Sequence, residues 1–139
     1  MIRITIPGKP VAKKRPRFAR IGKGVRTYSD QGTDEGRFLL HLMQQVKQPL
    51  EGPLWVEMIF CLPRPKGHFG SGRNAGTLKA SAPRYPTSKP DLDNLEKFAM
   101  DCCNGVAWKD DAQVVRSSSA KVFGDNPATV IQVKEAPPA

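Results

Sequence analysis

The carboxylates of this chain concentrate in two stretches. Asp91 and Asp93 lie in the run Lys-Pro-Asp-Leu-Asp-Asn-Leu-Glu-Lys (89–97), and Asp110 and Asp111 form a pair further on. Two carboxylates about 4 Å apart repel each other by about 4 kcal/mol at an effective dielectric near 20, so a cation between them is favourable. Oxygen ligands without histidine or cysteine suit Mg²⁺ or Mn²⁺. The pattern therefore indicates a candidate divalent-metal site.

Lys97 follows Asp93 by one helical turn. On a helix its ammonium could reach the same site and stabilise negative charge in a transition state. Structural explanations also exist: Asp93 with Glu96 fits a helix N-cap and its reciprocal partner, and Asp93 with Lys97 fits an ion pair. Asp110 and Asp111 could be turn residues. Spacing alone leaves a metal-nuclease site and a structural role open.

The positive charges are segregated from these acids. The chain has 22 Lys and Arg against 13 Asp and Glu, and residues 1–27 and 64–89 contain no acidic side chain. Such basic arms suit a phosphodiester backbone, whereas an acidic centre repels phosphate unless a cation is bound there. The distribution favours a metal-dependent nuclease over a simple DNA-binding protein. The side chains expected to contact DNA are Lys13, Lys14, Arg15, Arg17, Arg20, Arg73, Lys79, Arg84 and Lys89.

Hydrophobic periodicity predicts the elements that position these residues. We expect a half-buried strand at 2–6, a strand covered on both sides at 54–62, helices at about 34–47 and from Leu92 or Asp93 to Cys103, and an antiparallel hairpin of strands at about 112–123 and 129–134. This order indicates an α+β fold, a small mixed sheet with two main helices packed on it. Asp111 would join Asp91 and Asp93 if the strand after Asp110 lies beside the start of the second helix.

The length predicts one domain, 1–139, with a tail at 136–139. The basic arm at 9–28 could be a ribbon of two short strands or a solvated loop. The stretch 64–89 is rich in Gly, Pro and basic residues and lacks periodicity, so we expect a long mobile basic loop before the second helix. In it His68, Phe69 and Tyr85 could stack on exposed bases.

Compartment and cofactor indications are limited. No apolar stretch approaches the roughly 20 residues of a membrane helix, and the chain does not open with a secretory leader. We therefore expect a cytoplasmic location, and we expect no membrane partner. The cysteines, Cys61, Cys102 and Cys103, lack the spacing of a zinc site and are interpreted as reduced core thiols. His41 is expected to be a surface or packing residue. No small-molecule cofactor is indicated.

The run 89–97, with Asp101, Asn104-Gly105-Val106, Trp108 and the run Asp-Asp-Ala-Gln-Val (110–114), resembles the motif of the RusA family of Holliday junction resolvases. More loosely, the order of elements along the whole chain is similar to that family.

The resemblance implies a homodimeric, Mg²⁺-dependent endodeoxyribonuclease, with Mn²⁺ as an alternative ion, that resolves four-way DNA junctions by paired symmetric nicks in recombination and repair. Such enzymes are often encoded by phages or prophages, so the expected setting is a bacterial or phage-infected cell. Carried onto matching positions, Asp91, Asp93 and Asp111 are the catalytic metal-binding acids and Lys97 the catalytic lysine. Asp110 is a further ligand or a neighbour of the ligands.

The stretch 64–89 is absent from shorter members of the family. Two alternatives therefore accompany this interpretation: a broader nuclease for flaps and other branched DNA, and a non-catalytic DNA-binding protein whose acids are structural.

Overall fold

A computed structural model describes residues 1–15, 17–22, 24–28 and 31–139, and in the arm strands 17–21 and 25–28 it describes the backbone only. The strands are β1 (Ile2–Pro7), β2 (Arg17–Ile21), β3 (Gly24–Tyr28), β4 (Leu54–Leu62), β5 (Val114–Phe123) and β6 (Ala128–Glu135). The helices are α1 (Gly32–Gln45) and α2 (Leu92–Cys103), with short 3-10 helices at Lys66–His68, Gly72–Asn74 and Asp111–Gln113. The expected α+β class, mixed sheet and two main helices are confirmed.

The main sheet has the strand order β1-β6-β4-β5, in which β4 and β5 are parallel and the other pairs antiparallel. The predicted antiparallel hairpin of the last two strands is therefore wrong, because β4 lies between β5 and β6. The chain turns over the end of β4, where the Gly124 amide donates a 3.0 Å hydrogen bond to the Leu62 carbonyl. The strongly apolar β4 thus takes a central position and leaves the serine-rich β5 at the edge.

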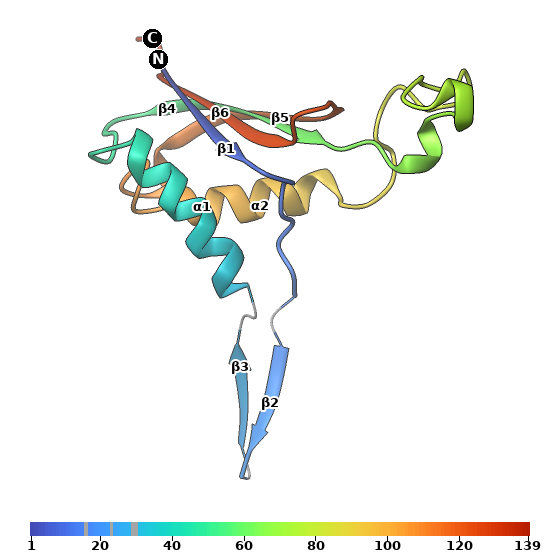
Figure 1. The fold of residues 1–139 in the computed structure, drawn as a ribbon. Coiled ribbons are helices and arrows are strands. Elements are labelled where there is room, and N and C mark those ends of the chain that lie inside the picture. The colour runs from blue at the N-terminus through green and yellow to red at the C-terminus, as the bar shows by residue number, and fades with distance from the viewer. Residues whose placement is uncertain (16, 23, 29–30) are drawn as a thin grey trace.

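Both helices cover one face of the sheet (Figure 1). Along β4 the side chains of Leu54, Val56, Met58, Phe60 and Leu62 are buried against them, while the alternate residues are partly covered or exposed. The prediction that this strand is covered on both sides is therefore wrong. On the open face Arg116 and Lys134 lie over the Trp55 ring, at 4.5 and 4.9 Å from its centroid, and shield this aromatic side chain from water.

The core lies between the sheet and the two helices. Phe38 of α1 meets Phe98 of α2 edge to face, with ring centroids 5.9 Å apart. Cys102 and Cys103 are buried in this layer, as expected of core thiols, and Cys61 is half-buried. Burial raises the pKa of the Cys102 thiol to about 12 and also raises the pKa of Cys103. In the described residues the three cysteines are free of disulfide bonds.

Strands β2 and β3 pair as a two-stranded antiparallel ribbon that extends away from the main sheet (Figure 1), which confirms the ribbon interpretation of the basic arm. The side chains of Phe18 and Tyr28, the aromatic residues of this arm, lie outside the described residues. Of the helices that the structure describes, none combines the length and the apolar character needed to span a membrane.

Candidate active site at the two ends of helix α2

Asp91 and Asp93 lie at the start of α2. Asp91 occupies the N-cap position and Asp93 the first turn, and both side chains are exposed. The carboxylate of Asp91 makes no capping hydrogen bond within the described part of the chain. The carboxylate of Asp93 lies 3.7 Å from the ammonium of Lys97, with both side chains more than 60 % exposed. A pair this exposed contributes little to stability, so these groups are available to a ligand.

This end of α2 is attached to β5. The ammonium of Lys121 donates to the carbonyls of Ser88 and Pro90 at 3.1 and 2.9 Å, which fixes the residues just before Asp91. One turn into the helix, Glu96 accepts hydrogen bonds from the hydroxyls of Ser117 and Ser119. Glu96 is therefore not the reciprocal partner of an N-cap at Asp93. These contacts show that α2 and β5 run antiparallel, with the start of α2 beside the end of β5.

Asp111 lies at the other end of the helix. Its carboxylate accepts a 2.7 Å hydrogen bond from the indole N–H of Trp108, and its backbone N–H donates to the side chain of Asn104, the C-cap of α2. Trp108 is fully buried, so its N–H group has a fixed direction. The negative charge of Asp111 also contributes to the raised pKa of Cys103. Asp111 is thus held in one orientation.

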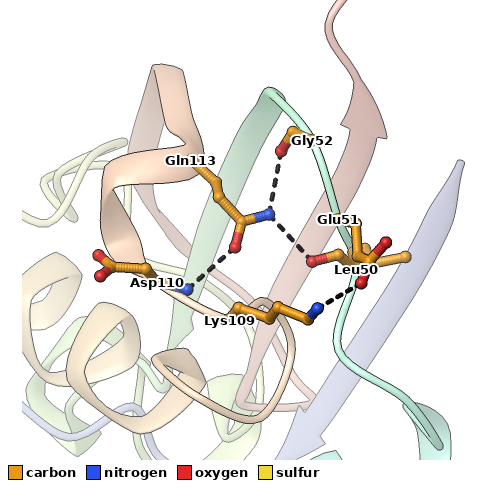
Figure 2. A network of polar contacts seen from close by, with 6 residues as sticks. All are labelled: Leu50, Glu51, Gly52, Lys109, Asp110 and Gln113. Carbon is orange, nitrogen blue, oxygen red and sulfur yellow. Dashed lines mark hydrogen bonds and ion pairs between the residues drawn. The ribbon is translucent and has the colours of Figure 1, made fainter.

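Asp110 has a structural role in this protein. Its carboxylate accepts from the Ala112 N–H at 2.9 Å, and its own N–H donates to the side chain of Gln113, so the two form a capping box for the 3-10 helix. Figure 2 shows how Gln113 also donates to the carbonyls of Leu50 and Gly52, both at 3.0 Å, beside the ion pair of Lys109 with Glu51. The network ties the start of β5 to the start of β4.

The two groups of acids are far apart within one chain. Helix α2 has 12 residues, and at about 1.5 Å per residue it is about 18 Å long. In the part of the chain that the structure describes, no group of three or more His, Cys, Asp or Glu side chains is close enough to hold a metal ion. The expectation that Asp111 joins Asp91 and Asp93 is therefore corrected for the single chain. Because β5 runs antiparallel to α2, its first residues lie at the far end of the helix.

The predicted DNA contacts fall on two structures. Lys13 does not point freely to solvent: its ammonium lies 3.0 Å from the carboxylate of Asp101, and its backbone N–H donates to the Asn94 carbonyl. At the base of the arm the Gln31 side chain accepts from the Lys14 N–H and donates to the Ala12 carbonyl. Exposed cations are Lys14, Arg15, Arg73, Lys79, Arg84 and Lys89, while the side chains of Arg17 and Arg20 lie outside the described residues.

The stretch 64–89 has more local structure than its composition predicts. It forms a small lobe beyond the end of β4 (Figure 1), with two 3-10 turns and a bridge between Phe69 and Leu78. Arg64 closes the lobe by donating to the Pro83 carbonyl at 2.7 Å, and its guanidinium lies 4.4 Å from the centroid of the Phe123 ring. The expectation of a stretch without structure is corrected, and its mobility stays a prediction.

Sequence reasoning missed the residues that position the acids. Trp108 and Asn104, which belong to the family motif but had no assigned role, orient Asp111, and Lys121, expected only as a strand residue, fixes the start of α2. Apart from the motif, Trp108 gave a local signal for its role, as a large aromatic residue with a polar N–H group three positions before an aspartate. Lys121 could not be found without knowing which elements pack against each other.

Comparison with known proteins gives a family match over most of the chain. The family model described as "Endodeoxyribonuclease RusA" matches residues 7–134. A relative in Bacillus subtilis (strain 168), "Uncharacterized protein YqaN", is 28% identical over 137 residues, which cover 96% of this chain and 96% of the relative. The matched region includes both ends of α2, the arm and the lobe. The chain therefore belongs to the RusA family of endodeoxyribonucleases.

Proposed function

We propose that the protein is a metal-dependent endodeoxyribonuclease that resolves Holliday junctions by paired nicks, and that each active site is completed by a second copy of the chain. The observation that carries this proposal is the separation of the acids. Asp91 and Asp93 lie at one end of α2 and Asp111 at the other, so within one chain these three described carboxylates do not reach one ion.

A symmetric dimer resolves this disagreement. In a two-fold dimer every contact occurs twice. If two α2 helices lie antiparallel across the axis, the start of each helix lies beside the end of the other. Asp91 and Asp93 of one protomer then face Asp111 of the partner subunit, and the same arrangement recurs on the other side of the axis. Two equal sites result, as paired nicks in a four-way junction require.

The acid set suits Mg²⁺, or Mn²⁺ in its place, only in such a dimer. Within one chain the residues do not fit an ion, so the metal requirement is tied to dimerisation. Lys97, exposed one turn from Asp93, would lie near the scissile phosphate and stabilise negative charge on it. Lys14, Arg15 and the cations of the lobe would hold the DNA backbone, since phosphate contacts position a protein on DNA without reading its sequence.

A mixing experiment tests the composite site. Asp91→Asn and Asp111→Asn proteins are each expected to be inactive. When they are unfolded together, refolded and mixed, about half of the dimers contain one copy of each variant, and each such dimer has one intact composite site. Nicking of a synthetic four-way junction in Mg²⁺ should then return to about a quarter of the wild-type number of active sites. A site built within one chain would stay inactive in every combination.

A broader nuclease for branched DNA is the second candidate. The lobe supports it, because it places the exposed cations Arg73, Lys79 and Arg84 beyond the sheet, where they could contact an additional strand. Cleavage of four-way junctions, flaps and linear duplex at equal concentration separates the two. A preference for the four-way junction by tenfold or more supports resolution, and equal rates on flaps support the broader activity. No nick in any substrate with either metal would favour a non-catalytic DNA-binding protein.

A further inference from the structure

A hollow lies between the lobe and the carboxyl ends of the parallel strands β4 and β5, with a volume of about 180 Å³. Its walls include Leu62 and Phe123, the last residues of these strands, and the returning limb of the lobe from Pro83 to Pro90. The carboxyl ends of neighbouring parallel strands are where open α/β sheets commonly bind ligands.

The wall of this hollow is apolar and aromatic. Pro86 is buried, and Phe123 is held from two sides, by the Arg64 guanidinium 4.4 Å from its ring centroid and by His68 edge to face at 5.4 Å. Tyr85 lies at the opening and is 59% exposed. A planar ring that enters the hollow would therefore meet the fixed ring of Phe123 and the more mobile ring of Tyr85.

The rim of the hollow is cationic. Lys9 and Lys89 line it and are exposed, and of the residues that line it, all of them described, none is acidic. An aromatic wall beside lysine side chains is the combination by which proteins bind single-stranded nucleotides, with the base stacked and the phosphate near a cation. Apolar ligands without charge would gain nothing from this rim.

The position of the hollow links it to the acids at the start of α2. Pro90 is part of its lining and Asp91 is the next residue. The carbonyls of Ser88 and Pro90 are held by Lys121, so the distance between the hollow and Asp91 is fixed by β5. A nucleotide bound here would bring a neighbouring phosphodiester close to Asp91.

We propose that this hollow receives one unstacked nucleotide from the branch point of the DNA and thereby selects the phosphodiester that is presented to Asp91. The inference rests on the proposed nuclease function and adds a residue-level determinant of the cut position. Bases at a branch point are the least costly to unstack, which favours them over bases within a duplex arm.

Fluorescence of 2-aminopurine tests the inference without cleavage. Four-way junctions carrying the probe at single positions around the branch point are bound to full-length Asp91→Asn protein without divalent metal. One position is expected to change its fluorescence on binding. Adding Tyr85→Ala should reduce this change about fivefold or more, the loss expected from one base stack. Adding Thr87→Trp, which puts a large side chain in the lining of the hollow, should abolish it.

Leu78→Ala is the matched control. Leu78 is an exposed apolar residue of the same lobe, 46% exposed, that does not line the hollow, so its removal should leave the fluorescence unchanged. Circular dichroism checks that each variant is folded. In Mg²⁺, Tyr85→Ala alone should scatter the cut over neighbouring positions, whereas Leu78→Ala should keep the wild-type cut.

The outcomes separate the two proposals. If the protein binds and nicks the junction but no probe position responds, or if Tyr85→Ala and Thr87→Trp leave the response intact, the nucleotide site is refuted and the nuclease proposal stands. If the wild-type protein neither binds nor nicks the junction, the nuclease proposal fails, and this inference fails with it.

Discussion

The acids at the two ends of α2 are held in different ways. At the start of the helix, Asp91 and Asp93 are exposed, and among the described side chains their one contact is the 3.7 Å ion pair of Asp93 with Lys97. At the end, Asp111 is half-buried and bonded both to the indole of Trp108 and, through its backbone, to Asn104. The first group can adjust to a ligand, whereas Asp111 is pre-oriented before any ligand arrives.

This difference teaches how a shared site could be assembled. A carboxylate with a fixed orientation defines where a bound ion must lie. Flexible carboxylates can then move to contact that ion, at a small cost in side-chain conformational entropy. Mutations at the two ends should therefore have different signatures. Changes at the start of α2 should affect activity alone, and changes at its end should affect both stability and activity.

The largest effect is expected from Asp91→Asn. Because this exposed carboxylate supports no described capping bond, the free energy of unfolding should change by less than about 0.5 kcal/mol. Nicking of a four-way junction should fall on the order of 100- to 1000-fold, as for loss of one electrostatic group at a reacting centre. Junction binding should persist or strengthen, since a charge that repels phosphate is removed. Loss of the cooperative thermal transition would instead make Asp91 a folding residue.

Trp108→Phe should show the contrasting signature. The change removes the N–H group that donates to Asp111 at 2.7 Å and leaves a partly buried carboxylate short of one partner. We expect a loss of stability of about 1–3 kcal/mol, measured by urea unfolding, together with slower nicking. Trp55→Phe is the matched control, because that indole lies on the open face of the sheet, away from α2. Equal effects of the two substitutions would contradict the positioning role of Trp108.

The cations of the basic arm should also differ in their effect, because Lys14 and Arg15 are exposed whereas Lys13 is paired with Asp101. Replacing exposed Lys14 and Arg15 with Ala should reduce the slope of log affinity against log salt by about two units if both meet phosphate. Lys13→Ala should change the slope less, because its ammonium is paired with Asp101. A larger slope change for Lys13 than for the other two together would show that DNA displaces this ion pair.

The smallest effect concerns the ion pair beside the Asp111 end. Lys109 holds the pKa of Glu51 below its ordinary value. A lowered carboxyl pKa contributes stability above the unfolded pKa, and the contribution is lost as the pH falls through the lowered value. Wild-type protein should therefore melt slightly above Glu51→Gln at neutral pH and together with it at low pH. A difference in melting temperature that stays constant from neutral to low pH would show that the Lys109–Glu51 ion pair does not cause it.

Local sequence patterns predicted the helices and strands themselves better than they predicted which strands pair with each other. The start of α2, the alternation in β1 and the apolar β4 follow from residue types within each segment, and they were predicted within a few residues. The pairing of β5 with β4 depends on contacts between distant segments. The short segment between the two expected strands, 112–123 and 129–134, suggested a hairpin, but β4 lies between these strands in the sheet.

The candidate site shows the same division. The residue types at Asp91, Asp93 and Asp111 were sufficient to identify them as candidates, since carboxylate spacing and motif are local properties. Their relative placement was not local: the direction of β5 along α2 decides at which end of the helix Asp111 lies. No pattern within 110–114 reveals that direction, so the sequence alone suggested one cluster where the structure has two.

The burial of Cys102 and Cys103 has a practical consequence for labelling. With the pKa of both thiols raised, almost no thiolate is present near pH 8, and alkylating dyes react with thiolates. Cys61, half-exposed on the open face of β4, is then the position that a maleimide dye should modify. One dye per protomer, on the face of the sheet opposite α2, would let energy transfer between protomers report assembly without substituting any of the acids.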